Sequence, residues 1–167
     1  MGDLLKDRVF HAETHPVSGM PSPNDRGGWS RVLVIDDDPD VGLLVQRILE
    51  LQGYDIVLTD DGLRGLAAAQ QQRPDAIVLD LMMPVMDGYE VLRQLRSDDR
   101  TSDVPVVVLT AVALKEAAEE VQRAGASSCL TKPFVPEELS AALSSAIATA
   151  SAARHPQPFP ADTPRPV

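Results

Sequence analysis

Short apolar runs rich in β-branched residues alternate five times with longer segments of helical character, and this alternation constrains the fold more than any other feature of the chain. The runs are expected strands, over residues 32–35, 54–58, 76–79, 104–109 and 128–131. The other segments are expected helices, over residues 39–52, 62–73, 87–97, 113–124 and 136–152. Strand–helix units repeated in this way form right-handed crossovers and a parallel sheet with helices on both faces. The sequence therefore predicts a three-layer, doubly wound α/β domain with a five-stranded parallel sheet.

Signals at the helix ends support these boundaries. Asp38 followed by Pro39 is typical of a helix cap and a first-turn proline, and Asp61 stands in a capping position before the second expected helix. Gly53 and Gly125 stand where two of the helices are expected to stop, since glycine adopts the left-handed conformation that ends many helices.

The two ends of the chain differ in composition from its middle. Residues 1–30 combine prolines and glycines with little hydrophobic periodicity, and we expect a flexible N-terminal arm there. Residues 154–167 are rich in proline, and we expect an extended Pro-rich C-terminal tail. The folded domain is accordingly expected over residues 31–153.

Reactive side chains follow four of the five expected strands. Asp36 and Asp37 come after the first strand, Asp80 after the third, Thr110 after the fourth and Lys132 after the fifth. The carboxyl ends of the strands form the ligand crevice of an open α/β sheet, so we expect these side chains to meet in space. Acids, a hydroxyl and a lysine at one place suit the metal-assisted transfer of a phosphoryl group to a carboxylate.

Each of these groups has a part in that chemistry. A carboxylate can attack phosphorus and carry the group as an acyl phosphate, while Mg²⁺ prefers carboxylate and phosphate oxygens as ligands. Lys132 would supply a fixed cation and Thr110 a hydroxyl donor to the transferring oxygens. The bond between Lys132 and Pro133 is a candidate cis peptide bond beside the site.

Four motifs, in order, give the chain a resemblance to the receiver domain of bacterial two-component response regulators, of the single-domain, chemotaxis type. They are Val34-Ile35-Asp36-Asp37-Asp38-Pro39, Leu79-Asp80-Leu81-Met82-Met83-Pro84-Val85-Met86-Asp87-Gly88, Val108-Leu109-Thr110-Ala111 and Leu130-Thr131-Lys132-Pro133-Phe134. The resemblance covers about three quarters of the chain. It implies a flavodoxin-like fold with the strand order 2-1-3-4-5 and the site at the switch point of the sheet.

The resemblance also implies a role for each acidic residue. Asp80 would be the phospho-acceptor. Asp37 and Asp80 would bind Mg²⁺ through their side chains, and the backbone carbonyl of Met82 would complete the protein's share of the ligands. Asp36 would act on the metal mainly through bound water.

At the other two motifs, the resemblance implies that Thr110 and Lys132 hold phosphoryl oxygens. The family usually has an aromatic residue three positions before this lysine, and its ring swings inward when the threonine moves. Here that position is Cys129, and a thiol cannot report burial as a ring does. We therefore expect a weaker switch, or one that depends on backbone shifts, and we interpret Cys129 as a small buried residue.

The composition of the chain limits the kinds of molecule that it is expected to bind. A formal net charge of -10 and a pI near 4.6 argue against direct binding to nucleic acid or to an anionic membrane. No stretch approaches the roughly 20 apolar residues of a membrane span, and the first residues lack a signal-peptide pattern, so we expect a cytoplasmic protein. The histidines stand at positions 11, 15 and 155, outside the expected domain. The phosphoryl group must therefore come from a histidine kinase, a histidine phosphotransfer protein or a small acyl phosphate.

These observations predict a response regulator that assists only its own phosphorylation and dephosphorylation and is not otherwise an enzyme. Residues 154–167 are too few to fold an effector module, so we expect a single-domain protein, either a monomer or a phosphorylation-dependent dimer. By resemblance, its protein target binds the fourth helix, fifth strand and fifth helix, at about 113–123, 127–131 and 137–150. Two alternatives stay open: a phosphorelay shuttle that passes phosphate to a partner histidine, and a receiver cut from a larger regulator or hybrid kinase.

Overall fold

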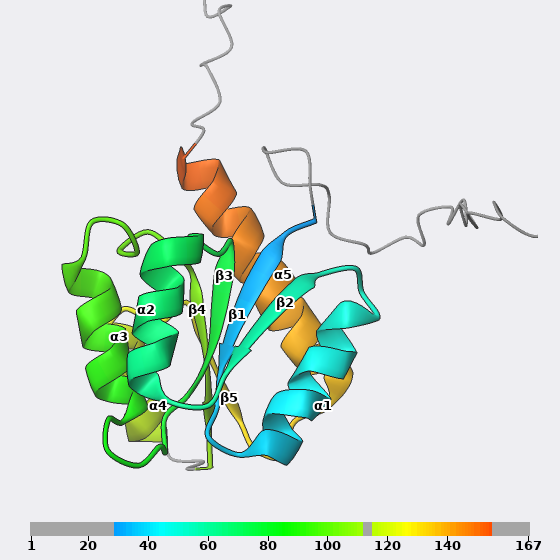
Figure 1. Cartoon of the computed structure of the whole chain (residues 1–167), viewed down its shortest axis with the longest axis horizontal. Coiled ribbons are helices and arrows are strands. Elements are labelled where there is room, and N and C mark those ends of the chain that lie inside the picture. The colour runs from blue at the N-terminus through cyan, green and yellow to red at the C-terminus, as the bar shows by residue number, and fades with distance from the viewer. Residues whose placement is uncertain (1–28, 112–114, 155–167) are drawn as a thin grey trace, which may run out of the picture.

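A computed structural model describes residues 29–111 and 115–154, in which five strands alternate with five helices (Figure 1). Their bounds are β1 Arg31–Ile35, α1 Pro39–Glu50, β2 Asp55–Thr59, α2 Gly62–Gln72, β3 Ala76–Asp80, α3 Gly88–Ser97, β4 Val106–Thr110, α4 Lys115–Arg123, β5 Ser128–Thr131 and α5 Pro136–Arg154. The strands are all parallel and lie in the order β2-β1-β3-β4-β5. The predicted three-layer fold and strand order are confirmed.

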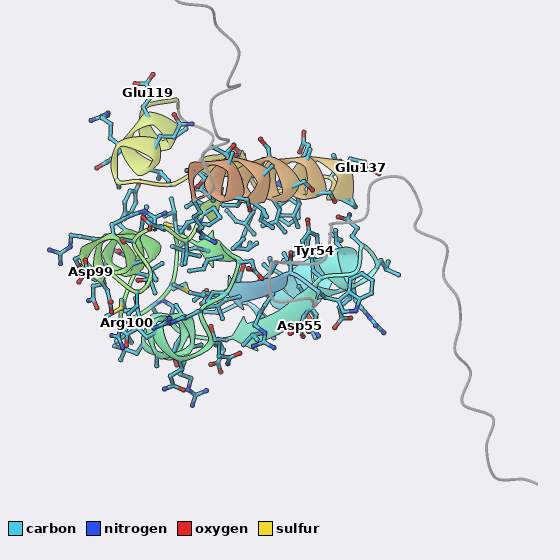
Figure 2. All side chains as sticks on the ribbon, turned by 90° about the horizontal axis from the view of Figure 1, so that it is seen from above. Tyr54, Asp55, Asp99, Arg100, Glu119 and Glu137 are labelled. Carbon is cyan, nitrogen blue, oxygen red and sulfur yellow. The ribbon has the colours of Figure 1, made fainter. Side chains whose placement is uncertain are left out.

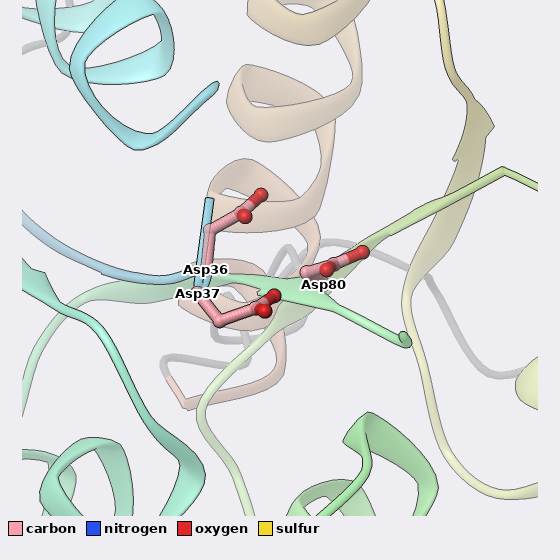
Figure 3. A group of neighbouring side chains, drawn as sticks. All are labelled: Asp36, Asp37 and Asp80. Carbon is pink, nitrogen blue, oxygen red and sulfur yellow. The ribbon is translucent and has the colours of Figure 1, made fainter. Parts of the chain in front are cut away.

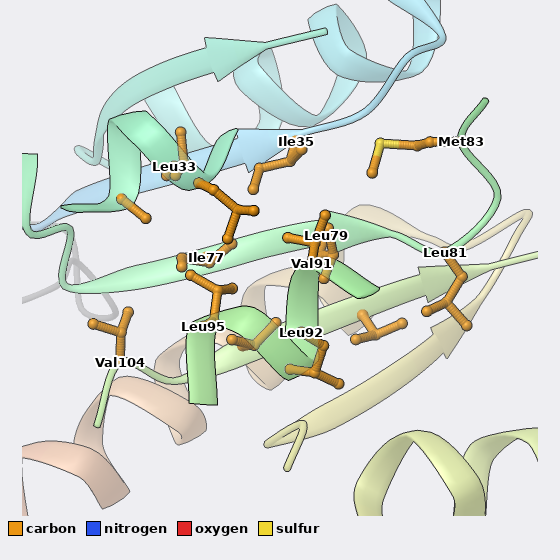
Figure 4. Packing of buried hydrophobic residues seen from close by; sticks show 14 of the residues in the cluster. Leu33, Ile35, Ile77, Leu79, Leu81, Met83, Val91, Leu92, Leu95 and Val104 are labelled. Carbon is orange, nitrogen blue, oxygen red and sulfur yellow. The ribbon is translucent and has the colours of Figure 1, made fainter. Parts of the chain in front are cut away.

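Alternate residues of the central strands feed two hydrophobic cores, one on each face of the sheet. Leu33 and Ile77 point to the face covered by α2, α3 and α4, where the larger core lies (Figure 4). Val34 and Val78 point to the opposite face, where α1 and α5 pack. Figures 1 and 2 show these helices on the two sides of the sheet. Strands buried on both faces explain why the central runs are continuously apolar rather than alternating.

The helix signals in the sequence operate as predicted. The Asp38 side chain accepts hydrogen bonds from the backbone N–H groups of Asp40 and Val41, at 3.0 and 3.4 Å, and thereby caps α1. The chain leaves α1 through Gly53, whose φ is +85°, and leaves α4 through Gly125, whose φ is +103°. These conformations are accessible to glycine because it has no Cβ.

The boundaries of the elements differ from the predicted ones by a few residues. β4 begins at Val106 rather than at 104, because the preceding Val104 N–H still closes a turn onto the Thr101 carbonyl, at 3.0 Å. α5 continues to Arg154, the first residue of the predicted tail. Ser30, the last residue of the predicted arm, is buried, and its carbonyl accepts a hydrogen bond from the Asp55 N–H. Residues 1–28 of the predicted arm and 155–167 of the predicted tail lie outside the described residues.

Among the described residues, no helix is both long enough and apolar enough to cross a membrane.

Candidate functional site

The parallel sheet brings the carboxyl ends of β1, β3, β4 and β5 to one edge. Asp36 follows β1, Asp80 ends β3, Thr110 ends β4 and Lys132 follows β5. Backbone hydrogen bonds hold these ends in place: the Asp36 N–H donates to the Thr59 carbonyl at 3.2 Å, and the Lys132 N–H donates to the Thr110 carbonyl at 2.7 Å. Residues far apart in the sequence are thus fixed side by side by the sheet.

Three carboxylates meet at this edge (Figure 3). Asp36, Asp37 and Asp80 each offer an oxygen, and these oxygens all lie within 4.8 Å of one another. Asp36 and Asp80 are buried, with exposed fractions of 2% and 4%, whereas Asp37 is accessible. Like charges at this separation repel strongly, and the repulsion grows as water is excluded. The arrangement is therefore stable only with a cation or a proton close by.

Lys132 supplies one such cation. Its Nζ lies 3.0 Å from Asp36 Oδ2 and 3.2 Å from Asp80 Oδ1, so one ammonium group bridges two buried carboxylates. Burial lowers the pKa of Lys132, but its hydrogen bonds and charge attraction to Asp36 and Asp80 outweigh this effect and leave the pKa raised. Lys132 is therefore held as a cation beside Asp80.

The pKa of Asp80 reflects opposing influences. Burial raises it most, the charge of Lys132 lowers it, the nearby charge of Asp36 raises it, and a hydrogen bond from the Met82 backbone N–H lowers it. The net effect is a pKa above the ordinary value of 3.8. A raised pKa in a cluster of charged groups is typical of residues with a chemical role.

The loop after β1 holds the Asp36 carboxylate in place. Asp36 Oδ1 accepts a hydrogen bond from the Asp38 backbone N–H at 2.9 Å, while Oδ2 faces Lys132. Asp38 is turned away to cap α1, as expected from its position before Pro39. Asp36 and Asp37 are thereby left as the two residues of this acidic run that face Asp80.

The loop after β3 passes unusually close to the same strand. A Cβ on Gly88 would lie 2.3 Å from the Asp80 carbonyl oxygen and 2.7 Å from Leu81 Cα, and the Gly88 N–H donates to the Leu81 carbonyl at 2.9 Å. Glycine is required by this approach of the start of α3. In the same loop, Val85 has a φ of +68° and is fully exposed, a conformation that β-branched residues rarely adopt.

The site fits a hard divalent cation. Three carboxylate oxygens converge at an accessible edge of the sheet, and Mg²⁺ is usually bound by one or two carboxylates together with phosphate oxygens and water. Asp37 and Asp80 are the residues that could hold it, because both Asp36 oxygens already have partners, the Asp38 N–H and Lys132 Nζ, whereas Lys132 lies against Oδ1 of Asp80. The arrangement can thus concentrate positive charge around one nucleophilic carboxylate.

The structure brings together Asp36, Asp37, Asp80 and Lys132, as the sequence predicted. Thr110 ends the neighbouring strand and is buried, with an exposed fraction of 2%. Their chemical roles stay predictions.

Two further predictions can be compared with the structure near this site. The peptide bond between Lys132 and Pro133 is cis, as predicted. For Met82, the structure shows its N–H donating to Asp80, while the predicted role of its carbonyl as a metal ligand stays a prediction.

Sequence reasoning missed two parts of the site. The first is the direct contact of Lys132 with Asp36, 96 positions away. The second is the close approach of Gly88 to Asp80. The signal for the second was present, because an aspartate followed by a glycine, Asp87-Gly88, stands at the start of a helix; Asp87 caps α3 by accepting from the Glu90 N–H at 2.9 Å.

Cys129 lies on β5, which β4 separates from β3, the strand that ends at Asp80. It is half-buried and packs against the larger core together with Tyr89 and Ala126, and burial raises the pKa of its thiol. Cys129 is thus partly rather than fully buried, as the prediction of a small buried residue had it, and the raised pKa disfavours a reactive thiolate.

Comparison with known proteins agrees with this geometry. Residues 32–144 match the family model described as the response regulator receiver domain. The DNA-binding dual master transcriptional regulator RpaA of Synechocystis sp. is 48% identical over 111 residues, which is 65% of this chain and 45% of that protein. The transcriptional regulatory protein PrrA of Mycobacterium tuberculosis is 47% identical over 109 residues, 65% of this chain and 46% of that protein. The chain spans about half the length of these curated relatives.

Solved structures show the same fold. The Vibrio cholerae chemotaxis protein CheY4 superimposes with a TM-score of 0.68 at 34% identity, over 71% of this chain and 99% of that one. The receiver domain of the sensor histidine kinase PA1611 from Pseudomonas aeruginosa, described with a magnesium ion coordinated in its active-site cleft, gives a TM-score of 0.67 at 34% identity, over 72% and 99%. The parallel sheet, the acidic edge and these matches together place the chain in the response regulator receiver domain family.

Proposed function

We propose that this chain accepts a phosphoryl group on Asp80 from a phosphohistidine of a partner protein, and that the phosphorylated form binds a downstream protein differently. One observation carries the proposal: Lys132 Nζ bridges the buried carboxylates of Asp36 and Asp80 at an edge where Asp37 also faces them. A nucleophile, a fixed cation and a further acid are therefore assembled at one point.

The transfer follows from these groups. An Asp80 Oδ atom attacks phosphorus, and the P–N bond to the donor imidazole breaks as the new P–O bond forms. The donor ring, protonated on its other nitrogen, takes the P–N electron pair and leaves as neutral imidazole. Lys132, whose Nζ already lies 3.2 Å from Asp80 Oδ1, would stabilise the negative charge of the incoming phosphoryl oxygens. A Mg²⁺ ion held by Asp37, Asp80 and the Met82 carbonyl would neutralise charge on those oxygens.

Thr110 provides a path from the site to the rest of the domain. It ends β4, pairs in register with Thr131 of β5, and its carbonyl accepts the Lys132 N–H. A movement of Thr110 toward the phosphoryl group would therefore displace the backbone of β5. Since Cys129 stands where an aromatic ring is usual, this coupling would act through the backbone of β5 rather than through a swinging ring.

The donor must be another molecule or another segment. All three histidines of the sequence lie outside residues 29–154, so the described domain has no phosphohistidine to offer. A histidine kinase or a histidine phosphotransfer protein would supply the group, and a small acyl phosphate would serve in its place in vitro. The output surface would be formed by α4, β5 and α5. Residues 112–114, which precede α4, lie outside the described residues. The domain would act as a monomer or as a phosphorylation-dependent dimer in the cytoplasm.

The first experiment is the intact mass of the protein after incubation with a small acyl phosphate and Mg²⁺. The expected result is one added phosphoryl group, and none on the Asp80→Asn variant. An Asp99→Asn variant, changed at an exposed carboxylate beyond the end of α3, serves as the matched control and should be labelled like the wild type. Addition of phosphate to the Asp80→Asn protein, or no addition to the wild type with either a small donor or a phosphorylated histidine protein, would refute the assignment.

A second experiment separates a switch from a phosphorelay shuttle. Phosphorylated protein is mixed with a histidine phosphotransfer protein, and the transfer of label back to histidine is followed. A switch is expected to retain the label or release it as inorganic phosphate, whereas rapid return to histidine would identify a shuttle. RpaA is described as DNA-binding, but this chain matches less than half of it, so the absence of nucleic-acid binding stays a prediction for these residues.

A further inference from the structure

A groove of about 450 Å³ lies at the end of the domain opposite to Asp80. One wall is the C-terminal half of α5, and the other is formed by the loops that lead into β4 and β5. Its lining includes Ala142, Ala146, Ala150, Val104, Pro105 and Ser127. Because Val104 and Ser127 precede their strands, the groove opens at the amino ends of the sheet, away from the carboxylate cluster.

The small side chains of α5 explain why this groove exists. Ala142, Ala146 and Ala150 recur every four residues and therefore form one ridge of the helix. On the neighbouring face, Leu139 and Leu143 are fully buried against the sheet. Figure 1 shows the C-terminal part of α5 running past the amino ends of the strands, so its last turns have methyl and hydroxyl groups where larger side chains would fill the space.

The chain itself leads into this groove. Ala153 lines it, and Arg154, the last described residue, donates from its Nη2 to the Asp103 carbonyl at 3.2 Å, while Asp103 lines the opposite wall. α5 therefore ends at the rim of the groove. A second copy of the domain is a poorer occupant, because an isologous contact would place one concave surface against another.

The sequence after Arg154 supplies a short Pro-rich segment with one large apolar side chain. It reads His155-Pro156-Gln157-Pro158-Phe159-Pro160, and Phe159 is the only aromatic residue beyond α5. Each proline biases the residue before it toward an extended conformation, and such preformed segments dock into grooves with little loss of conformational entropy. No backbone donor is left unsatisfied at a proline, because proline has no N–H.

The distances are compatible with this contact. The ridge from Ala142 to Ala153 extends about 16 Å, at roughly 1.5 Å per helical residue. Five residues of extended chain, from Arg154 to Phe159, reach about the same length at roughly 3.1 Å per residue. The aromatic ring can therefore reach any point of the groove once the chain turns back along α5.

We propose that residues 155–160 dock in this groove, with the Phe159 ring between the alanine ridge of α5 and the loop at Val104 and Pro105. The contact would cover the C-terminal half of α5 with the chain's own continuation. It is independent of phosphorylation at Asp80, because the groove and the carboxylate cluster lie at opposite ends of the sheet.

The test uses the full chain labelled with 4-fluorophenylalanine and observed by ¹⁹F NMR in the presence of a soluble paramagnetic agent. The sequence has phenylalanines only at positions 10, 134 and 159, and a Phe159→Leu variant assigns the signal of interest. An Ala150→Leu substitution fills the groove, whereas Ala148→Leu adds the same bulk at an exposed residue of α5 that does not line it. Circular dichroism of both variants checks that the fold is retained.

The expected result is a Phe159 signal that is shielded from the agent in the wild type and in Ala148→Leu, with loss of shielding in Ala150→Leu. A Phe159 signal as accessible as that of the free amino acid would overturn the proposal. Shielding that persists in Ala150→Leu would place the ring elsewhere and would also overturn it. Shielding that disappears on dilution would show a contact between copies instead of docking within one chain.

Discussion

Replacing Asp37 by asparagine is expected to stabilise the metal-free protein. The substitution keeps the shape of the side chain and removes one of three negative charges whose oxygens lie within 4.8 Å of one another. Lys132 already compensates part of this charge through its contacts with Asp36 and Asp80, at 3.0 and 3.2 Å. Lys132 therefore offsets the charges of Asp36 and Asp80 directly, whereas the charge of Asp37 adds repulsion to the cluster.

The magnitude follows from Coulomb's law. Two unit charges about 4.8 Å apart repel by roughly 3.5 kcal/mol at an effective dielectric constant near 20. Asp37 is accessible to water, which screens much of this repulsion, so a gain of about 1–2 kcal/mol in the free energy of unfolding is expected. For a protein of this size, roughly 2–4 °C of melting temperature corresponds to each kcal/mol, so the shift should be about 2–8 °C.

The assay is thermal unfolding at pH 7, first in EDTA and then with increasing Mg²⁺. In EDTA, Asp37→Asn should melt above the wild type. With Mg²⁺, the wild type should gain stability with the logarithm of the metal concentration, whereas the variant should gain little. Asp99→Asn is the matched control, because Asp99 is an exposed carboxylate beyond the C-terminal end of α3 (Figure 2), whereas the opposite end of that helix, at Gly88, approaches Asp80.

Two results would refute the reasoning. If Asp37→Asn melts at or below the wild-type temperature in EDTA, the carboxylates do not repel as their distances require. If Asp99→Asn is stabilised by as much as Asp37→Asn, the gain reflects the net charge of the protein and not the cluster.

Three further substitutions test other parts of the fold. Gly88→Ala should destabilise the protein by about 3 kcal/mol in denaturant unfolding, because its Cβ would lie 2.3 Å from a backbone carbonyl oxygen of β3. Gly42→Ala is the control and should be near neutral, because its Cβ would meet only a flexible leucine side chain at 3.0 Å. Equal destabilisation by the two substitutions would contradict this view. Val85→Asn should stabilise by about 1 kcal/mol, since asparagine tolerates a positive φ, and an unchanged melting temperature would count against strain in this loop. Hydrogen bonds from Arg100 lower the pKa of Asp98 to about 2. The ionised form is thus favoured by folding, so Asp98→Asn should lower the melting temperature at pH 7, with a difference that shrinks as the pH falls toward 2; a constant difference would exclude this linkage.

The fold could be predicted from the sequence because buried strands and helices require apolar residues at regular spacings. Five apolar runs separated by helical segments allow few arrangements other than a parallel sheet, and capping residues such as Asp38 and glycines such as Gly53 mark where the helices begin and end. The boundary errors lie where local patterns are weakest. Val104 belongs to an apolar run but closes a turn before β4, and its hydrogen bond to Thr101 has no counterpart in the hydrophobic pattern.

The residues that gather at the carboxyl edge could be inferred from the sequence alone, because strand ends in a parallel sheet share that edge whatever the details of packing. The sequence did not indicate that Lys132 contacts Asp36 as well as Asp80, since side-chain distances across a sheet depend on strand register, twist and the paths of the loops. The approach of Gly88 to the β3 backbone and the groove beside α5 became apparent only in the three-dimensional structure. Both depend on how closely two separately predicted elements pack, and that separation is set by every side chain between them and is not encoded in either element alone.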